Sequence, residues 1–276
     1  MSLGTRAPTT AGAGTAETGR IAFDRVAVRY GGFTAVEDLS FEVSAGQFVA
    51  VVGPTGCGKS WLLNVVAGLL PPAQGSVQTG QTAVRGVNRD CAYMFQTDAL
   101  LPWKTALDNV LLGPLLRGRP RPEALALARD WLARVGLGGF EDRYPHQLSG
   151  GQRKRVAMAQ VLINRLPILL MDEPFSALDV QTRALMEQEL LGLWQELGST
   201  VLFVTHDLEE AIALADRIIL LGAGPGSRLK GDFRVDLPRP RNVVEARFTP
   251  GFGDIYQRVW TTLREEVLAS YARQRG

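Results

Sequence analysis

The chain has 276 residues, with 30 Lys or Arg against 28 Asp or Glu, so its formal net charge is only +2. This balance excludes a polybasic nucleic-acid binder, although it leaves room for a local basic patch. Cys57 and Cys91 are the only cysteines, too few for a disulfide framework, and they suit a reducing compartment. The length fits one large domain or two modest ones.

No stretch of the sequence predicts a membrane span or a secretory signal. The longest uncharged stretch covers residues 60–84, but its apolar part, residues 61–73, contains Asn64 and closes with prolines, whereas a span needs about 20 apolar residues. Residues 1–19 are small and polar and lack an apolar signal core. We therefore predict a disordered tail over residues 1–19 and a cytoplasmic protein.

The first predicted elements are strands. Residues 21–30 alternate in polarity with a slip near Asp24 and Arg25, and residues 39–43 alternate again. Residues 48–52 are uniformly apolar, which is typical of a strand buried on both faces of a mainly parallel sheet. A glycine-rich segment follows, and then residues 61–70 have the character of a helix.

The pattern changes between residues 97 and 155, where apolar residues recur at helical spacing and are interrupted by Pro and Gly. We predict an inserted helical subdomain there. Beyond it we expect strands and helices in alternation, which predicts an α/β core with parallel pairing, built from residues 20–96 and 156–232. The expected elements are strands 168–171, 200–205 and 217–221, and helices 180–197 and 208–215. Residues 233–276 form a C-terminal extension with a final amphipathic helix over 255–271.

The glycine-rich segment matches the phosphate-binding loop pattern and lies between a predicted strand and a predicted helix. Its glycines let consecutive backbone N–H groups turn toward phosphate oxygens, and the helix N-terminus adds a partial positive charge. Lys59 would bring a full charge to the β and γ phosphates, and the Ser60 hydroxyl would bind Mg²⁺. The bland alternative is a turn without a ligand. The loop consists of Gly53, Pro54, Thr55, Gly56, Cys57, Gly58, Lys59 and Ser60.

An acidic pair, Asp172 and Glu173, follows directly after the predicted strand 168–171. Asp172 could hold the Mg²⁺ shell, and Glu173 could orient or deprotonate a water that attacks the γ-phosphate. Taken alone, such a pair is more often a helix N-cap. The phosphate loop upstream favours the catalytic interpretation.

The pentapeptide Leu148-Ser149-Gly150-Gly151-Gln152 precedes a predicted helix over residues 153–162. Its serine hydroxyl and glycine N–H groups could form a second anion cradle at the helix start. Here the chain resembles the ATP-binding cassette (ABC) family of transport ATPases, whose signature is this pentapeptide. The resemblance implies the ABC ATPase fold: a RecA-like P-loop NTPase core, an N-terminal antiparallel β subdomain and an inserted α-helical subdomain. It also implies a head-to-tail homodimer, in which Ser149, Gly150, Gly151 and Gln152 face the γ-phosphate of ATP bound to the opposite subunit.

Other family elements occur in order along almost the whole chain. Tyr30 matches the aromatic residue that stacks on adenine, and Gln96 matches the glutamine that senses Mg²⁺ and water. Residues 176–179 resemble the loop that crosses the dimer interface. His206 matches the switch histidine that contacts the γ-phosphate, although a lone histidine at a strand end is usually structural. For His146, the only other histidine, we expect a solvated or interfacial structural role.

Within the family, the chain is most similar to cassettes of the nitrate, sulfonate and taurine importers, through residues 96–103, 179–183 and 237–241. The resemblance implies that residues 100–103 receive the coupling helix of a membrane permease; packing at a helix start is the alternative. We therefore expect an ATP-hydrolysing importer subunit that uses ATP and Mg²⁺. It would sit peripherally on the cytoplasmic side of the inner membrane. It would drive uptake of a small anion, such as a sulfonate, taurine or nitrate, delivered by a substrate-binding protein.

The sequence departs from the family pattern at two positions. Trp61 stands where the family usually has a threonine whose hydroxyl reaches the α-phosphate, so a bulky ring would lie beside the nucleotide and ATP affinity is in question. Gln160 stands where many cassettes have arginine, outside the catalytic cradle.

Two other function classes remain open. A non-transport cassette acting in translation or DNA maintenance typically carries two cassettes or a long coiled-coil insertion. Here about 95 residues separate Gly53 from Leu148, and no heptads fill them. A small-molecule kinase could use the same phosphate loop, but it would leave the signature pentapeptide unexplained.

Overall fold

The computed structural model describes the backbone of residues 18–275. Most of the predicted N-terminal tail, residues 1–17, lies outside this range. Within it, Gly19 is buried, and a Cβ on Gly19 would lie 2.5 Å from the Thr200 hydroxyl oxygen. The predicted tail therefore extends too far, because the chain already packs against the core at residue 19.

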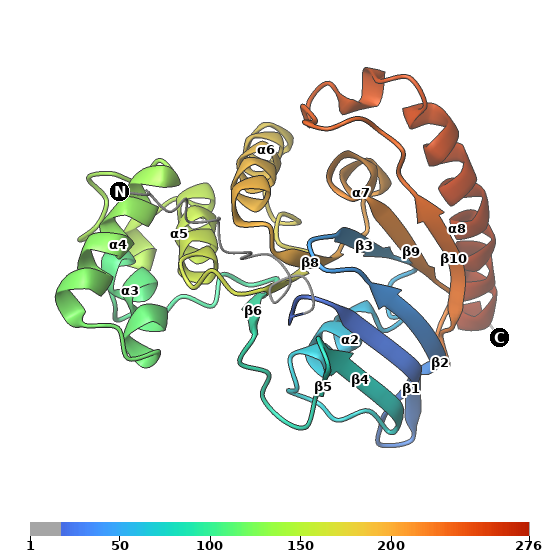
Figure 1. The fold of residues 1–276 in the computed structure, drawn as a ribbon. Coiled ribbons are helices and arrows are strands. Elements are labelled where there is room, and N and C mark those ends of the chain that lie inside the picture. Colours follow the sequence, from blue (N-terminus) through green and yellow to red (C-terminus); the bar gives the residue numbers. More distant parts are fainter. Residues whose placement is uncertain (1–17, 276) are drawn as a thin grey trace, which may run out of the picture.

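A six-stranded sheet with the order β10-β9-β3-β8-β7-β6 forms the core of the molecule (Figure 1). The strands from β9 to β6 are parallel, and β10 adds antiparallel to β9 at one edge. The strands are β3 (Phe48–Val52), β6 (Cys91–Met94), β7 (Ile168–Asp172), β8 (Thr200–Val204), β9 (Arg217–Leu221) and β10 (Leu229–Arg234). The predicted α/β core with parallel pairing is confirmed.

Helices cover both faces of this sheet. Alternate residues of β3 point to opposite faces: Phe48 and Ala50 pack with α6 (Val180–Leu197) and α7 (Leu208–Leu214), whereas Val49 and Val51 pack with α2 (Lys59–Val66) and the N-terminal sheet. In Figure 1, α6 and α7 lie on one side of the sheet and α2 on the other. This double cover explains why β3 is apolar at every position.

A second, antiparallel sheet with the order β2-β1-β4-β5 lies against α2. It contains β1 (Ile21–Tyr30), β2 (Phe33–Val43), β4 (Gln74–Thr79) and β5 (Thr82–Ala83). The slip predicted in β1 is a bulge: the pairing register with β2 shifts between Phe23 and Val26, and Arg25 adopts φ +46°. An extra residue in one strand accounts for the broken alternation.

The helical subdomain extends from the β6 edge of the core sheet (Figure 1). It comprises α3 (Ala106–Leu116), α4 (Arg121–Arg134), a short 3₁₀ turn η1 (Pro145–Gln147) and α5 (Gly150–Leu162). The predicted boundary at residue 155 falls inside α5, so this helix belongs to the subdomain along its whole length. Asn109 orders the entry to α3, because its side chain accepts from Leu101 N–H and donates to the carbonyls of Leu101, Lys104 and Thr105.

The C-terminal segment returns to the core through η2 (Ala246–Phe248) and α8 (Phe252–Arg275), which runs beside β10 (Figure 1). The predicted start of the extension at residue 233 falls inside β10, and α8 is longer than the predicted helix 255–271. Arg241 is buried and donates to the carbonyl of Ala215, and Arg239 pairs with Asp216. Burial lowers the pKa of Arg241 to about 10. These arginines fix the segment to the end of α7.

Within the described residues, no helix is both long and apolar enough to cross a membrane.

Candidate functional site

The phosphate loop connects the buried strand β3 to α2, as the sequence predicts. Gly53 has φ +157°, and a Cβ there would lie 2.7 Å from the Leu221 carbonyl oxygen. Gly58 has φ +98°, and its Cβ would lie 2.7 Å from the side chain of Val36. Both positions combine an unfavourable φ with a steric clash, so only glycine fits them.

Lys59 lies across this loop with its side chain buried. Its Nζ donates to the carbonyl oxygens of Gly53 at 2.9 Å and Pro54 at 3.1 Å. These partners are neutral, so the ammonium charge is available to an anion in the loop. Burial raises the pKa of the neighbouring Cys57 thiol, while the Lys59 charge opposes this shift. Cys57 is therefore a protonated, structural residue at neutral pH.

Ser60 and Asp172 bring two oxygen ligands together. The Ser60 hydroxyl donates to Asp172 Oδ1 at 3.0 Å. Burial raises the pKa of Asp172, while the Ser60 hydrogen bond opposes this shift. Among the described residues there is no cluster of three or more His, Cys, Asp or Glu able to hold a metal. A hydroxyl and one carboxylate fit Mg²⁺, which completes its octahedral shell with waters and substrate phosphates.

Glu173 stands at the end of β7, where it receives contacts from two other predicted site residues. Its Oε2 lies 3.2 Å from Nδ1 of His206 and 3.4 Å from Nε2 of Gln96. Glu173 has φ +42°, a left-handed conformation that costs a non-glycine residue on the order of 1–3 kcal/mol. The chain accepts this local cost at Glu173, and the unusual backbone conformation sets the direction of the carboxylate.

Two aromatic rings border the phosphate loop on the side of the N-terminal sheet. Tyr30 ends β1 and is 68% exposed, and its ring centroid lies 5.7 Å from that of Trp61, the residue after Ser60. An exposed ring at this place can stack on a planar base. The structure thus places Trp61 against the residue for which the sequence predicts adenine stacking.

The signature residues form the start of α5. Ser149 is its N-cap: its hydroxyl accepts from Gln152 N–H at 3.2 Å, and Gln152 Oε1 accepts from Ser149 N–H at 2.9 Å. With Ser149 as the N-cap, the helix starts at Gly150 rather than at the predicted residue 153, and the two glycines belong to its first turn. Ser149 and Gly150 are exposed, so the helix N-terminus opens outward from the chain.

The signature and the phosphate loop are joined indirectly. Lys154, one helical turn into α5, donates to the Gln96 carbonyl at 3.0 Å and pairs with Asp98 at 3.3 Å. Among the described residues, the side-chain hydrogen bonds of Ser149 and Gln152 stay within the capping box. In one copy of the chain, no side-chain hydrogen bond among the described residues therefore joins Ser149 or Gln152 to the phosphate loop.

The loop of residues 176–179 connects the turn of Glu173 to the start of α6. The Ser176 hydroxyl donates to the Glu173 carbonyl at 3.0 Å, and Asp179 caps α6 by accepting from Thr182 N–H. Val180 beside it is 75% exposed. His146 stacks on Tyr144 in the turn before the signature, so it has the surface position that the sequence predicts.

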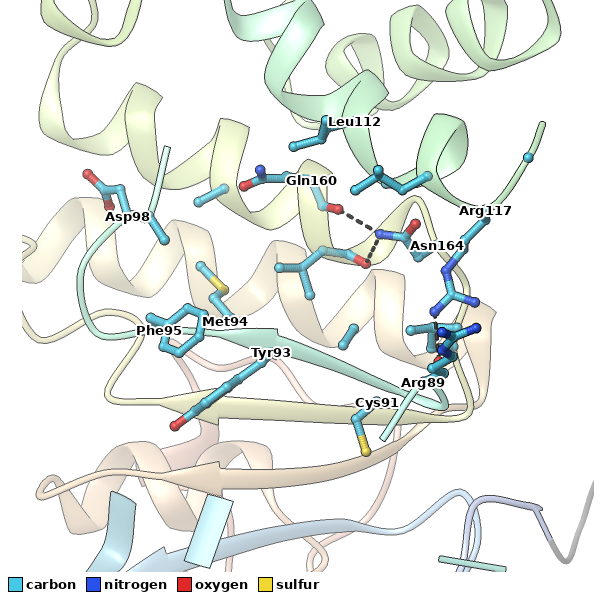
Figure 2. A pocket seen from close by; sticks show the side chains of 18 residues that line it. Arg89, Cys91, Tyr93, Met94, Phe95, Asp98, Leu112, Arg117, Gln160 and Asn164 are labelled. Atoms are coloured by element: carbon cyan, nitrogen blue, oxygen red, sulfur yellow. Dashed lines mark hydrogen bonds between the residues drawn. The ribbon is translucent and has the colours of Figure 1, made fainter. Parts of the chain in front are cut away.

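A groove of about 930 Å³ separates β6 from α3 and α5 (Figure 2). Sequence patterns did not reveal it, because its walls come from separate segments. It is lined by Gln160 of α5, Leu112 of α3 and Phe95 after β6, together with Asn164 and Arg117, which follow α5 and α3. The buried Oδ1 of Asn164 has no hydrogen-bond partner among the residues that the structure describes.

The predicted docking residues 100–103 lie next to this groove rather than in it. Leu100 packs on the core, and both backbone groups of Leu101 bond to Asn109. For these two residues the structure favours packing at a helix start. Trp103 is 72% exposed, so it alone in this stretch offers a large apolar side chain to a partner.

The fold and these clustered residues define a phosphate-loop ATPase. Comparison with known proteins agrees: residues 36–176, about half of the chain, match the family model described as ABC transporter. An uncharacterised ABC transporter ATP-binding protein of Methanocaldococcus jannaschii is 44% identical over 86% of this chain and 86% of its own length. The dimeric cassette MJ0796 bound to ADP and Pi is 32% identical, with a TM-score of 0.68, over 78% of this chain and 98% of that structure.

The chain belongs to the ABC transporter family, and it is an ATP-binding ATPase with the ABC ATPase fold. The predicted resemblance, fold and enzyme class are confirmed. Relatives include the taurine import ATP-binding protein TauB of Escherichia coli, 42% identical over 89% of this chain and 94% of that protein. The aliphatic sulfonates import ATP-binding protein SsuB of Yersinia pestis is 45% identical over 87% of this chain and 85% of that protein.

Proposed function

We propose that this chain is the ATPase subunit of an importer and works as a head-to-tail homodimer. The observation that carries this proposal is the separation of the two anion cradles. Lys59, Asp172 and Glu173 gather at one end of the sheet, whereas Ser149 opens outward at the start of α5. Two antiparallel copies would bring each phosphate loop against the signature residues of the other copy, and one copy alone cannot do this.

In such a dimer, each residue has a defined role toward ATP. Lys59 would turn from its carbonyl partners to the β and γ phosphates, and the loop glycines would present their N–H groups to the same oxygens. Ser60 and Asp172 would hold Mg²⁺, with Gln96 at the edge of its shell. When bound, Mg²⁺ neutralises the charge that develops on the phosphates.

The convergence on Glu173 supports a general-base role. Its carboxylate would accept a proton from the water that attacks the γ-phosphate. His206 contacts Glu173 through Nδ1, which leaves the other ring nitrogen for the γ-phosphate. Gln96 contacts the same carboxylate, so one side chain would join the metal shell, the attacking water and the switch histidine. Tyr30 would stack on adenine, with Trp61 against its ring.

The groove between β6 and α5 supports docking of a membrane permease. It is bordered by apolar side chains such as Phe95 and Leu112 and by Arg117 at one end (Figure 2), which suits a short amphipathic helix of a partner. Trp103 lies exposed nearby and would extend that interface. Through this contact the chain would work from the cytoplasmic face of the inner membrane.

The relatives support a sulfonate-like cargo. TauB and SsuB are named for import of taurine and of aliphatic sulfonates, and both match most of this chain. We therefore propose that the complete importer takes up a small anion of the sulfonate or nitrate kind, which a substrate-binding protein delivers to the permease.

The decisive experiment combines association with transport. The chain is coexpressed with a candidate importer permease, and the purified complex is placed in vesicles with a candidate substrate-binding protein. We expect copurification and ATP-dependent uptake of at least one anion from a panel of taurine, alkanesulfonates and nitrate. A chain that hydrolyses ATP but neither binds a permease nor supports uptake would contradict the importer function.

A further inference from the structure

Two buried glutamates lie side by side beneath the switch histidine and take no part in the mechanism described above. Glu187 on α6 and Glu210 on α7 are both buried, and their carboxyl groups hydrogen-bond to each other. Burial of two carboxyl groups in contact is costly unless one of them keeps its proton. The presence of this costly pair therefore indicates a structural or functional role.

The pair is bonded directly to the turn that holds His206. Glu210 accepts a hydrogen bond from the Thr205 hydroxyl, and Thr205 Oγ1 in turn accepts from Asp207 N–H at 3.0 Å. Asp207 also caps α7, because its Oδ1 accepts from Glu209 N–H at 2.9 Å. Thr205 and Asp207, the residues on either side of His206 in the sequence, are thus held by side-chain hydrogen bonds. Glu210 is the last acceptor in this series of bonds.

Arg183 extends the same network to the loop of residues 176–179. Its Nη1 lies 3.5 Å from Asp207 Oδ2, and its Nη2 donates to the Leu178 carbonyl at 3.2 Å. Leu178 directly precedes Asp179 in the loop of residues 176–179. The network therefore joins the turns that follow β8 and β7, which are the turns that carry His206 and Glu173.

The charge on the pair depends on a single proton. Burial is the main cause that raises the pKa of Glu187, to about 9, and the neighbouring Glu210 raises it further. Burial also raises the pKa of Glu210, while the hydrogen bonds from Thr205 and Glu187 oppose this shift. Between about pH 7, to which burial raises the pKa of Glu210, and about pH 9, Glu187 is therefore the protonated donor and Glu210 the acceptor. Two small cavities border the pair. The other charged or titratable side chains that line them are Glu173, Arg183, His206, Asp207, Glu209 and Arg247.

We propose that Glu187 and Glu210 are positioning residues for the switch histidine, and that the proton they share holds the turn of residues 205–207 in its active geometry. The inference rests on the proposed role of His206 in ATP hydrolysis. When the shared proton is lost to solvent base, two buried carboxylates repel each other, Glu210 loses its donor, and the turn loosens. Turnover should then fall at alkaline pH although Lys59, Asp172 and Glu173 are untouched.

The test is the pH profile of steady-state ATP hydrolysis by the full chain, from about pH 6 to about pH 10. Glu187→Gln keeps the size and the donor but has no proton to lose. We expect it to retain wild-type turnover near pH 7 within about twofold, and to be at least about threefold more active than wild type near pH 9.5. Glu187→Leu removes the donor, and we expect a lower kcat near pH 7 with an unchanged KM for ATP.

The matched control is Glu196→Gln, because Glu196 is an exposed carboxylate on the same helix and pairs with Arg134. Its profile should follow that of the wild type. An alkaline limb that is the same in wild type and Glu187→Gln, or a wild type with no such limb, overturns the proposal. Equal loss in Glu187→Gln and Glu187→Leu also overturns it, since bulk alone would then matter. Absence of any hydrolysis by wild type at every pH would instead contradict the catalytic site itself.

Discussion

The phosphate-loop end of the core sheet and the groove beside the helical subdomain are built in opposite ways. At the loop, residues 53–60 are contiguous, and each has a local reason to be there: glycines for the left-handed backbone, a lysine across the loop, a hydroxyl at the helix start. The groove takes its walls from β6, α3 and α5, and its lining residues share no sequence pattern. A nucleotide site is thus visible in sequence, whereas a docking surface is defined only by the folded chain.

The largest effect should come from Lys59→Ala, which tests the loop side of the comparison. Lys59 is the motif residue that brings a full positive charge to the phosphates, and its present partners are neutral carbonyls. We expect turnover to fall to background and ATP binding to weaken, as measured by phosphate release and calorimetry. Near-native turnover in this variant would show that the loop does not hold the reacting phosphates.

Glu173→Gln should separate binding from chemistry. The amide keeps the contacts to His206 and Gln96 but cannot accept a proton from water, so we expect turnover to fall by roughly 10²–10⁴-fold. Binding should survive, and the variant should accumulate as an ATP-bound dimer of about twice 30.0 kDa, measured by light scattering at high protein concentration. Adding Ser149→Arg should abolish this dimer, because the side chain would fill the second cradle. A dimer that tolerates Ser149→Arg would contradict the head-to-tail arrangement.

Substitutions in the groove should spare ATP hydrolysis and abolish coupling to the permease. Leu112→Arg places a charge in the apolar wall, and Trp103→Ala removes the exposed ring beside it. We expect both variants of the isolated chain to keep basal ATP hydrolysis within about twofold, since neither touches the nucleotide site, while permease binding and uptake are lost. A collapse of basal activity would place these residues in the catalytic core and remove the contrast between the two regions.

The buried carboxyl pair gives a stability prediction with a definite sign. The pKa of Glu187 in the folded chain, about 9, lies above its unfolded value of about 4.3. Between these values the folded state binds more protons than the unfolded state, so this group makes the free energy of unfolding decrease as pH rises. Glu187→Gln should remove that slope and gain stability over wild type, by up to about 1.4 kcal/mol per pH unit. Urea unfolding of both proteins near pH 6 and near pH 8 measures this difference. If the free energy of unfolding changed equally with pH in wild type and in Glu187→Gln, the shared proton would be contradicted.

How much of the molecule could be predicted depends on how local each signal is. The apolar strands β3, β7, β8 and β9 and the motifs at their ends were predicted, because burial on both faces forces continuous apolar runs. The strands β4, β5, β6 and β10 were missed, since they are short or partly exposed and lack a clear alternation. The predicted start of α5 lies three residues too late, because its capping residue and the two glycines after it carry no apolar periodicity.

The same reasoning explains which site features were missed. The contacts among Ser60, Asp172, Glu173 and His206 follow from parallel strands that end at one edge of the sheet, so motif order was enough to expect them. The Glu187–Glu210 pair joins two helices that are each amphipathic in the usual way. In sequence, Glu187 resembles any polar helix residue, and only packing reveals that it is buried.

The smallest expected effect concerns Trp61, which belongs to the loop region but departs from the family pattern there. Trp61→Thr adds a hydroxyl beside the α-phosphate, and one neutral hydrogen bond contributes about 1 kcal/mol. It also removes the ring that lies 5.7 Å from Tyr30, a contact of about 0.5–1.5 kcal/mol that orders the adenine platform. Because the second term is similar in size to the first, we expect the affinity for ATP to change by no more than about twofold, as measured by calorimetry.

Two further variants separate these terms. Trp61→Ala loses the ring without gaining a hydroxyl, so it should bind ATP more weakly than Trp61→Thr; equal affinities would show that residue 61 does not reach the nucleotide. Trp61→Phe keeps an aromatic contact with Tyr30 but removes one of the five tryptophans. If Trp61 lies beside the adenine, the fluorescence change on ATP binding should shrink in Trp61→Phe while the affinity stays within about twofold. An unchanged fluorescence response would place the indole away from the base, and the tilt toward Tyr30 would then be packing within the free protein alone.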